Sequence, residues 1–195
     1  MCSLNDRYSQ VMAVTDRKLC RRPFLEQIER VCALHPRAVI LREKDLAESE
    51  YEMLAKDVAS VCGIYGVPCI YHIFTDAAMR AGMDAVHLPL WRLRELAGRT
   101  ELEPFRMIGV SIHSAAEAKE AEGLGAGYLT AGHIYATDCK RGLPPRGLGF
   151  LKEVCQAVSI PVYGIGGIRL ENAQIKEVLE AGASGVCVMS EMMRI

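Results

Sequence analysis

The sequence lacks the features that mark membrane proteins and nucleic-acid-binding proteins. Its 195 residues contain no apolar run near the roughly 20 residues that a membrane-spanning helix needs. It also lacks an excess of one charge, with 23 basic residues against 24 acidic ones, so no basic surface is expected that would hold nucleic acid or an anionic membrane. We therefore expect a small-molecule partner, with no nucleic acid and no membrane.

Paired cysteines and a secretion signal are missing as well. None of the eight cysteines forms a C-x-x-C pair, and this argues against a zinc ribbon or a thiol redox motif. Scattered cysteines suit a reducing compartment, where most of them act as small apolar side chains. The first ten residues, MCSLNDRYSQ, do not show the charged-then-apolar order of a secretion signal. We expect a cytoplasmic protein.

Short apolar segments alternate with amphipathic segments along the whole chain. The apolar segments predict eight strands, and these cover 11–16, 38–43, 68–74, 85–90, 107–113, 127–135, 160–167 and 184–190. Apolar residues at helical spacing predict helices over 24–34, 48–61, 115–124, 149–157 and 170–181. Strands that are apolar throughout are covered on both faces, as in a parallel sheet. The pattern predicts a single (β/α)8 barrel domain over 1–195, with a doubly wound open sheet as the alternative.

The C-terminus is short for this fold. Only 191–195 follow the last predicted strand, too few for the helix that normally covers the seam between the eighth and first strands. Either a partner subunit covers this seam or the seam stays partly exposed. We expect a homo-oligomer.

The segment 132–147, GHIYATDCKRGLPPRG, places a histidine where an apolar run meets a polar, cationic loop. In a parallel α/β protein, the strand ends and the loops after them carry the chemistry. His133 is the candidate general base, because an imidazole with an unperturbed pKa of about 6.5 suits proton abstraction at neutral pH. Thr137 and Lys140 are candidate substrate-binding residues. A histidine that only anchors its loop is the alternative.

A phosphate site is predicted where the seventh and eighth strands end. Gly166 and Gly167 let backbone N–H groups approach an anion, and the following helix start adds a favourable dipole. Met189 and Ser190 end the next strand, and (β/α)8 enzymes often bind phosphate between these two loops. A purely structural turn is the alternative.

Further candidate ligand-binding residues lie at the ends of other strands. Arg42 and Lys44 follow the second strand, and with Lys140 they suit a second acidic group of the ligand. Ser111 and His113 end the fifth strand as candidate ligand contacts. His72 and His87 suit a structural, hydrogen-bonded role at least as well as a catalytic one. No pair of carboxylates stands at the strand ends, so we expect no metal site.

From Ile108 to Ser190 the sequence resembles the thiamine phosphate synthase/TenI family of small (β/α)8 barrels. The motifs that carry the resemblance are IGVSIHS, AEAKEAEGLGAGYLTAGHIYATDCKRGLPPRGL, SIPVYGIGGI and AGASGVCVMS, with VTD at Val14 and REK at Arg42 in the first half. The resemblance implies one of two activities for the chain.

Synthases of this family join a pyrimidine diphosphate to a thiazole phosphate with magnesium held by aspartates after the third and fourth strands. Their pattern has an Asn-Asp pair at the first of these places and an acidic residue a few places beyond the histidine of the second. This chain reads YHIFTD over 71–76 and HLPLWR over 87–92, so the carboxylate pair is incomplete and Arg92 stands where an acid is expected. Ile40 replaces the glutamine that normally precedes the arginine of the second strand.

The loop after the sixth strand instead resembles that of the TenI-type thiazole tautomerases. In that subgroup the histidine matching His133 is the acid/base that aromatises a thiazole carboxylate phosphate, whereas synthases usually have Gly-Pro there. The resemblance therefore favours a cofactor-free thiazole tautomerase acting on a small phosphorylated thiazole. The alternatives are a magnesium-dependent thiamine phosphate synthase and a non-catalytic thiazole-phosphate binding or regulatory protein.

Overall fold

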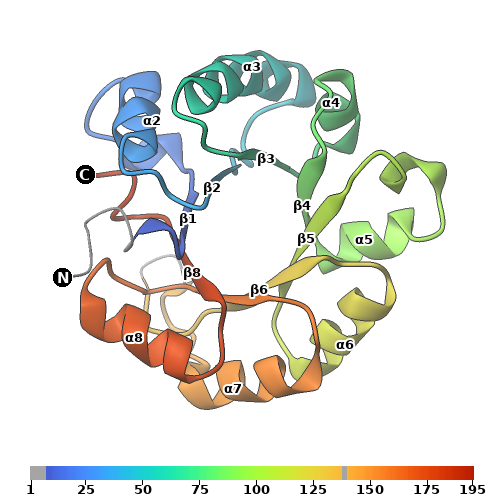
Figure 1. Ribbon diagram of the computed structural model, residues 1–195, viewed down its shortest axis with the longest axis vertical. Helices are drawn as coiled ribbons and strands as arrows, with labels where there is room; N and C mark the ends of the chain where they lie inside the picture. Colours follow the sequence, from blue (N-terminus) through green and yellow to red (C-terminus); the bar gives the residue numbers. More distant parts are fainter. Residues whose placement is uncertain (1–7, 138–139) are drawn as a thin grey trace.

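The computed structural model describes residues 8–137 and 140–195 and shows a closed barrel of eight parallel strands. Each strand pairs with the next along the chain, and β8 pairs with β1. Figure 1 shows the strands as a central ring with the helices around it. The predicted barrel is confirmed, and the open sheet is wrong. The strands are β1 Val11–Val14, β2 Ala38–Leu41, β3 Cys69–His72, β4 Ala85–Pro89, β5 Met107–Ile112, β6 Tyr128–Gly132, β7 Val162–Ile165 and β8 Gly185–Val188.

The five predicted helices are present, with shifted ends. They are α2 Phe24–Cys32, α3 Glu48–Ile64, α6 Ala115–Gly123, α7 Gly147–Ala157 and α8 Asn172–Glu180. The sequence pattern missed the two short helices α4 Thr75–Arg80 and α5 Leu90–Leu96, because two turns are too few to show a helical period. Single 3-10 turns cover Arg17–Leu19 and Thr100–Leu102. Within the described residues, no helix is long and apolar enough to cross a bilayer, and the cytoplasmic location stays a prediction.

Side chains along each strand alternate between two separate cores. On β2, for example, Val39 and Leu41 belong to the large core under the helices, whereas Ala38 and Ile40 belong to a small core in the barrel interior. Side chains of both cores are buried, so the sequence of a barrel strand is one continuous apolar run. The interior core also contains Met12, Val14, Ile70, Tyr128, Tyr163 and Cys187.

Polar side chains form the next interior layer of β3 to β6. His72, His87, Ser111 and Thr130 each stand two residues along their strand from an inward position, and strand alternation turns them inward too. His87 is hydrogen-bonded through Nδ1 to the Tyr128 hydroxyl at 2.9 Å and through Nε2 to Ser111 Oγ at 2.8 Å. The Thr130 hydroxyl donates to Ser111 Oγ at 3.1 Å. His87 is therefore tied into the barrel through both ring nitrogens.

The C-terminal residues close the seam between β8 and β1. Met192 and Met193 have no exposed surface, and Gln27 on α2 donates from Nε2 to the Met192 carbonyl at 2.7 Å. The expected gap at this seam is wrong, because these residues fill it. The homo-oligomer stays a prediction, and the seam gives no reason for it.

Replacing Met192 by alanine should destabilise the fold. The side chain is fully buried, so Met192→Ala should lower the free energy of unfolding by about 2–5 kcal/mol through lost burial and a cavity. Met53→Ala is the matched control, since Met53 is 64% exposed and its loss should change stability by less than about 0.5 kcal/mol. Urea unfolding measures the free energy of unfolding of both variants. Equal losses in the two variants would show that the C-terminal residues around Met192 are not part of the core.

The buried His87 should make the fold sensitive to acid. Burial, and then the charge of Arg42, lowers the pKa of His87 to about 3, whereas an unfolded histidine titrates near about 6.5. Between these values the unfolded chain binds the extra proton, so His87's contribution to stability is complete above pH 6.5 or so and is lost as the pH falls towards about 3. His87→Asn should reduce the pH slope of the unfolding free energy there by up to about 1.4 kcal/mol per pH unit.

The control for this slope is His35→Asn. His35 is exposed and has a φ of 50°, a backbone conformation that asparagine tolerates. Urea unfolding at a series of pH values should give this variant the wild-type slope. An unchanged slope in His87→Asn would contradict a buried, neutral His87.

Candidate functional site

The candidate site residues follow the carboxyl ends of the strands. The loop after β6 lies directly against the two glycines that follow β7. A Cβ atom added to Gly166 would stand 2.4 Å from His133 Cβ, and one added to Gly167 would stand 2.4 Å from the Ala136 carbonyl oxygen. Both glycines also have a positive φ, 97° and 70°. Only glycine fits at either position, so the glycines alone do not indicate a ligand.

Three backbone N–H groups after β7 and β8 are available to a ligand. The backbone N–H groups of Gly166, Gly167 and Ser190 donate to no acceptor among the residues that the structure describes. Ser190 and Met189 follow β8 and are half-buried. Unpaired backbone N–H groups gathered at strand ends suit an anion such as phosphate. One expectation needs correction: α8 begins at Asn172, so the helix start does not directly follow Gly167.

His133 is held by its backbone beside these groups. Its carbonyl accepts the Arg146 N–H at 2.9 Å, and the N–H of the next residue, Ile134, donates to the Ile165 carbonyl at 3.0 Å. The Tyr135 hydroxyl fastens the same loop to α8 by donating to Glu177 at 2.6 Å. The peptide bond between Gly132 and His133 is cis.

The His133 ring carries a buried nitrogen without a partner. The residue is half-buried, and its Nε2 atom is shielded from solvent yet makes no hydrogen bond with any described residue. Such an atom costs free energy unless a ligand or water satisfies it. Gly166 is in contact with the Cα and Cβ atoms of His133, so His133 stands beside the glycines that carry two of the free N–H groups.

Arg42 and Lys44 follow β2, on the opposite side of the barrel from β6, and the acid between them has other partners. Glu43 is only 3% exposed. It accepts the Thr15 hydroxyl at 2.7 Å and forms an ion pair with Arg17 at 2.9 Å. The Arg42 N–H in turn donates to Thr15 Oγ1 at 2.9 Å. Glu43 thus braces the loops after β1 and β2 and leaves its two cationic neighbours for a ligand.

The cationic side chains at the barrel mouth lie close enough to affect one another's pKa values. Partial desolvation, followed by the charges of Arg42 and Lys140, lowers the pKa of Lys44. Lys140 comes from the loop after β6, where its N–H donates to the Thr137 carbonyl at 3.0 Å. The structure therefore brings these cations together from two sides of the barrel mouth. Asp138 and Cys139, which lie between Thr137 and Lys140, fall outside the described residues.

Ser111 and His113 have different surroundings despite their neighbouring positions. Ser111 is part of the interior network around His87. The His113 ring is half-exposed and lies 3.5 Å from Glu117. Burial is the largest influence on the His113 pKa and lowers it, helped by the charges of Arg146 and Lys140. His113 is therefore a rim residue near the cationic loop.

The described residues do not fit magnesium. None of their His, Cys, Asp and Glu side chains form a group of three or more that would hold a metal ion. At the places where the resemblance calls for carboxylates, Ile73 and Phe74 follow β3, and Arg92 forms an ion pair with Glu95 at 3.0 Å. Asp76 is exposed on α4. The part of the chain that the structure describes therefore offers a divalent cation no set of carboxylate ligands.

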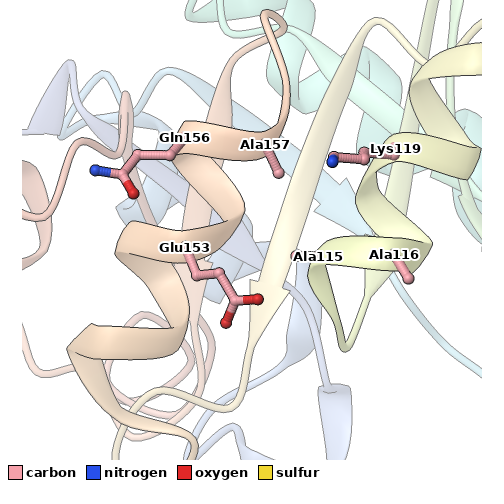
Figure 2. A pocket seen from close by; sticks show the side chains of 6 residues that line it. All are labelled: Ala115, Ala116, Lys119, Glu153, Gln156 and Ala157. Atoms are coloured by element: carbon pink, nitrogen blue, oxygen red, sulfur yellow. The ribbon is translucent and has the colours of Figure 1, made fainter.

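Sequence reasoning gave Thr15, Glu43 and Thr130 no role, and for His72 and His87 it left a structural and a catalytic role open. Thr15 and Glu43 brace Arg42, and His72, His87 and Thr130 form the interior polar layer. The available signal was strand alternation, which turns every second residue of β3 to β6 inward. A groove outside the barrel, between α6 and α7, contains none of the candidate residues (Figure 2); its lining is Ala115, Ala116, Lys119, Glu153, Gln156 and Ala157.

Comparison with known proteins agrees with this architecture. The sequence profile described as thiamine monophosphate synthase matches residues 11–192. A thiamine-phosphate synthase of Clostridium acetobutylicum is 37% identical over 186 residues, covering 92% of this chain and 85% of that protein. Thiamine-phosphate synthase 2 of Streptococcus pneumoniae is 34% identical over 171 residues, covering 88% and 80%.

A solved structure gives the same result for the fold. Thiamine phosphate pyrophosphorylase from Pyrococcus furiosus superimposes with a TM-score of 0.78 at 29% identity, covering 98% of this chain and 90% of that one. The names of the Clostridium and Streptococcus relatives favour the synthase activity over the tautomerase activity. The profile match, the sequence identities and the barrel agree, and the chain belongs to the thiamine phosphate synthase/TenI family of thiamine biosynthesis.

Proposed function

We propose that this protein is a thiazole tautomerase, which aromatises a carboxythiazole phosphate without a cofactor. The observation that carries the proposal is the buried, unpartnered Nε2 of His133, on a residue whose Cα and Cβ atoms are in contact with Gly166, where the N–H groups of Gly166 and Gly167 are free. A base next to an anion cradle is what a proton shift on a phosphorylated ring requires. The incomplete carboxylate set after β3 and β4 supports the same choice.

Each part of the site has a role in this reaction. The free N–H groups of Gly166, Gly167 and Ser190 hold the phosphate, and Arg42 and Lys44, with Lys140, hold the carboxylate side of the ring. His133 removes a proton from the non-aromatic dihydrothiazole and a proton returns elsewhere on the conjugated system, so atoms and charge balance. Aromatisation drives the reaction, and the protein supplies placement and a base.

In this proposal, four further residues contact the substrate. Thr137 lies in the same loop as His133 and holds the Lys140 backbone. Met189 borders the phosphate end beside Ser190. Ser111 and His113 line the side of β5, where Ser111 also fixes His87. These residues orient the substrate without taking part in the proton shift.

Thiamine phosphate synthase is the second candidate, and the names of the relatives favour it. Its diphosphate substrate would suit the cations Arg42, Lys44 and Lys140. The incomplete carboxylate set speaks against it, because a diphosphate leaving group needs its developing charge stabilised, as a metal ion does. A protein that binds thiazole phosphates without turning them over is the third candidate.

Replacing His133 separates these functions. Because general acid–base catalysis contributes about 10²–10⁴-fold, His133→Asn should lower tautomerase turnover by a factor in that range while thiazole phosphate binding persists. Turnover of the wild type should not change when magnesium is added or chelated. A coupled assay measures turnover, and calorimetry measures binding.

The control is His35→Asn, which alters an exposed histidine and should keep wild-type turnover. Full activity of His133→Asn would refute the role of this residue. Magnesium-dependent joining of the two precursors by the wild type would establish the synthase instead. Binding of thiazole phosphates without turnover of either substrate would establish the non-catalytic protein.

A further inference from the structure

Two buried cysteine thiols are in contact outside the barrel, between the neighbouring helices α2 and α3 (Figure 1). Cys32 is the last residue of α2, and Cys62 lies in the last turn of α3. The Cys32 thiol donates a hydrogen bond to Cys62 Sγ at 3.7 Å, and the two residues are 0% and 1% exposed. Thirty residues separate them in the sequence, so the contact exists because the two helices pack on each other.

This contact has the chemistry of a dithiol site. Burial as small apolar side chains accounts for each cysteine alone, but it gives no reason for the two sulfur atoms to meet. A disulfide needs a sulfur–sulfur distance of about 2.0 Å, and each sulfur can approach the other by rotation about its Cα–Cβ bond. Both residues stand where their helices end, and because helix ends fray, a small oxidant can reach them.

The surroundings keep both thiols neutral while the protein is reduced. The hydrogen bond to Cys62, and then burial, raises the pKa of Cys32 above its usual value. The hydrogen bond from Cys32 lowers the pKa of Cys62, but contact with the half-buried Cys69 and burial outweigh it and raise that pKa to about 12. Since the thiolate is the reactive form of cysteine, we expect slow oxidation that begins at Cys62, whose pKa is raised less.

We propose that Cys32 and Cys62 are an oxidative modification site, at which a peroxide converts the two thiols into a reversible disulfide that tethers α2 to α3. The Cys62 thiolate attacks a peroxide oxygen and the O–O bond breaks, which gives a sulfenic acid and, with the proton that Cys62 released, one water. The Cys32 sulfur then attacks the Cys62 sulfur, the S–O bond breaks, and a second water leaves with the Cys32 proton. The two thiols thus lose two electrons and two protons, which convert one hydrogen peroxide into two waters.

The modification site lies at the opposite end of the barrel from the candidate functional site. α3 begins at the mouth, where the Tyr51 hydroxyl in its first turn donates to the Leu41 carbonyl of β2 at 2.7 Å. It ends just before β3 begins, where the Val67 N–H donates to the Cys62 carbonyl at 3.0 Å. The disulfide therefore leaves the mouth unchanged, and the proposal does not depend on the proposed function. A reversible bond of this kind suits a reducing compartment, where protein disulfides are usually transient or redox-sensing.

Disulfide mapping of the full-length protein tests the proposal. The reduced protein is treated with hydrogen peroxide until the half-buried Cys155 has reacted, the remaining thiols are alkylated, and the protein is digested with trypsin and chymotrypsin. The digest puts Cys32, Cys62 and Cys69 on separate peptides, because the chain is cut after Arg30, Arg37, Lys56 and Tyr65.

We expect peptide 31–37 joined to peptide 57–65, two hydrogen atoms lighter than the sum of the two and released by dithiothreitol. Alkylated thiols at Cys32 and Cys62, a bond between Cys62 and Cys69, or any other product at the two residues would overturn the proposal.

Variants make the test specific. Cys69→Ser is the matched control and should still form the cross-link, whereas Cys62→Ser should abolish it. Oxidation should raise the melting temperature of the wild type by about 5 °C or more, because a tether across thirty residues constrains the unfolded chain, and it should not raise that of Cys62→Ser. If Cys62→Ser does not fold, mapping of the wild type decides alone. Loss of the cross-link in Cys69→Ser, or a wild-type melting temperature that does not rise, would contradict a direct tether between Cys32 and Cys62.

Discussion

The close contact between the loop after β6 and the glycines after β7 is the constraint on which the site depends. Side chains at 166 or 167 would collide with His133 or Ala136, so glycine at both positions lets the loop rest on the end of β7. That contact brings His133 to the place where backbone N–H groups have no acceptor in the described chain. The proposed base and the proposed anion cradle thereby become neighbours, although more than thirty residues separate them in the sequence.

On the opposite side of the barrel mouth, the acidic residues near Arg42 and Lys44 are paired with other groups. The buried Glu43 carboxylate accepts a hydrogen bond from Thr15 and forms an ion pair with Arg17. The nearby Asp45 forms ion pairs with Arg17 and Lys18. The acids near Arg42 and Lys44 are therefore satisfied by groups outside the mouth. Arg42 and Lys44 therefore give the proposed anion site a net positive charge, although the charges of the whole chain nearly balance.

The sequence predicted the barrel well because both faces of every strand are buried. This gives continuous apolar runs such as AVIL at β2, and a run of this kind is visible without any long-range information. The short helices α4 and α5 were missed because two turns show no clear period, and closure of the seam was missed because it depends on Gln27 reaching Met192, 165 residues away. Local patterns carry no signal for such a contact.

The candidate site was predictable only in part for the same reason. Strand ends identified Arg42, His133, Gly166 and Ser190, because parallel strands gather their carboxyl ends at one edge. The sequence did not reveal that Glu43 turns away from its neighbours or that both ring nitrogens of His87 are hydrogen-bonded. These contacts arise from which strands become adjacent when the barrel closes, and only the three-dimensional structure supplies that pairing.

A crystal structure of the protein with a carboxythiazole phosphate bound tests the central claim most directly. The proposed mechanism predicts the phosphate on the N–H groups of Gly166, Gly167 and Ser190, with His133 Nε2 within hydrogen-bonding distance of the ring. A phosphate held elsewhere, a His133 ring turned away from the thiazole, or an ordered divalent cation at the mouth would contradict it.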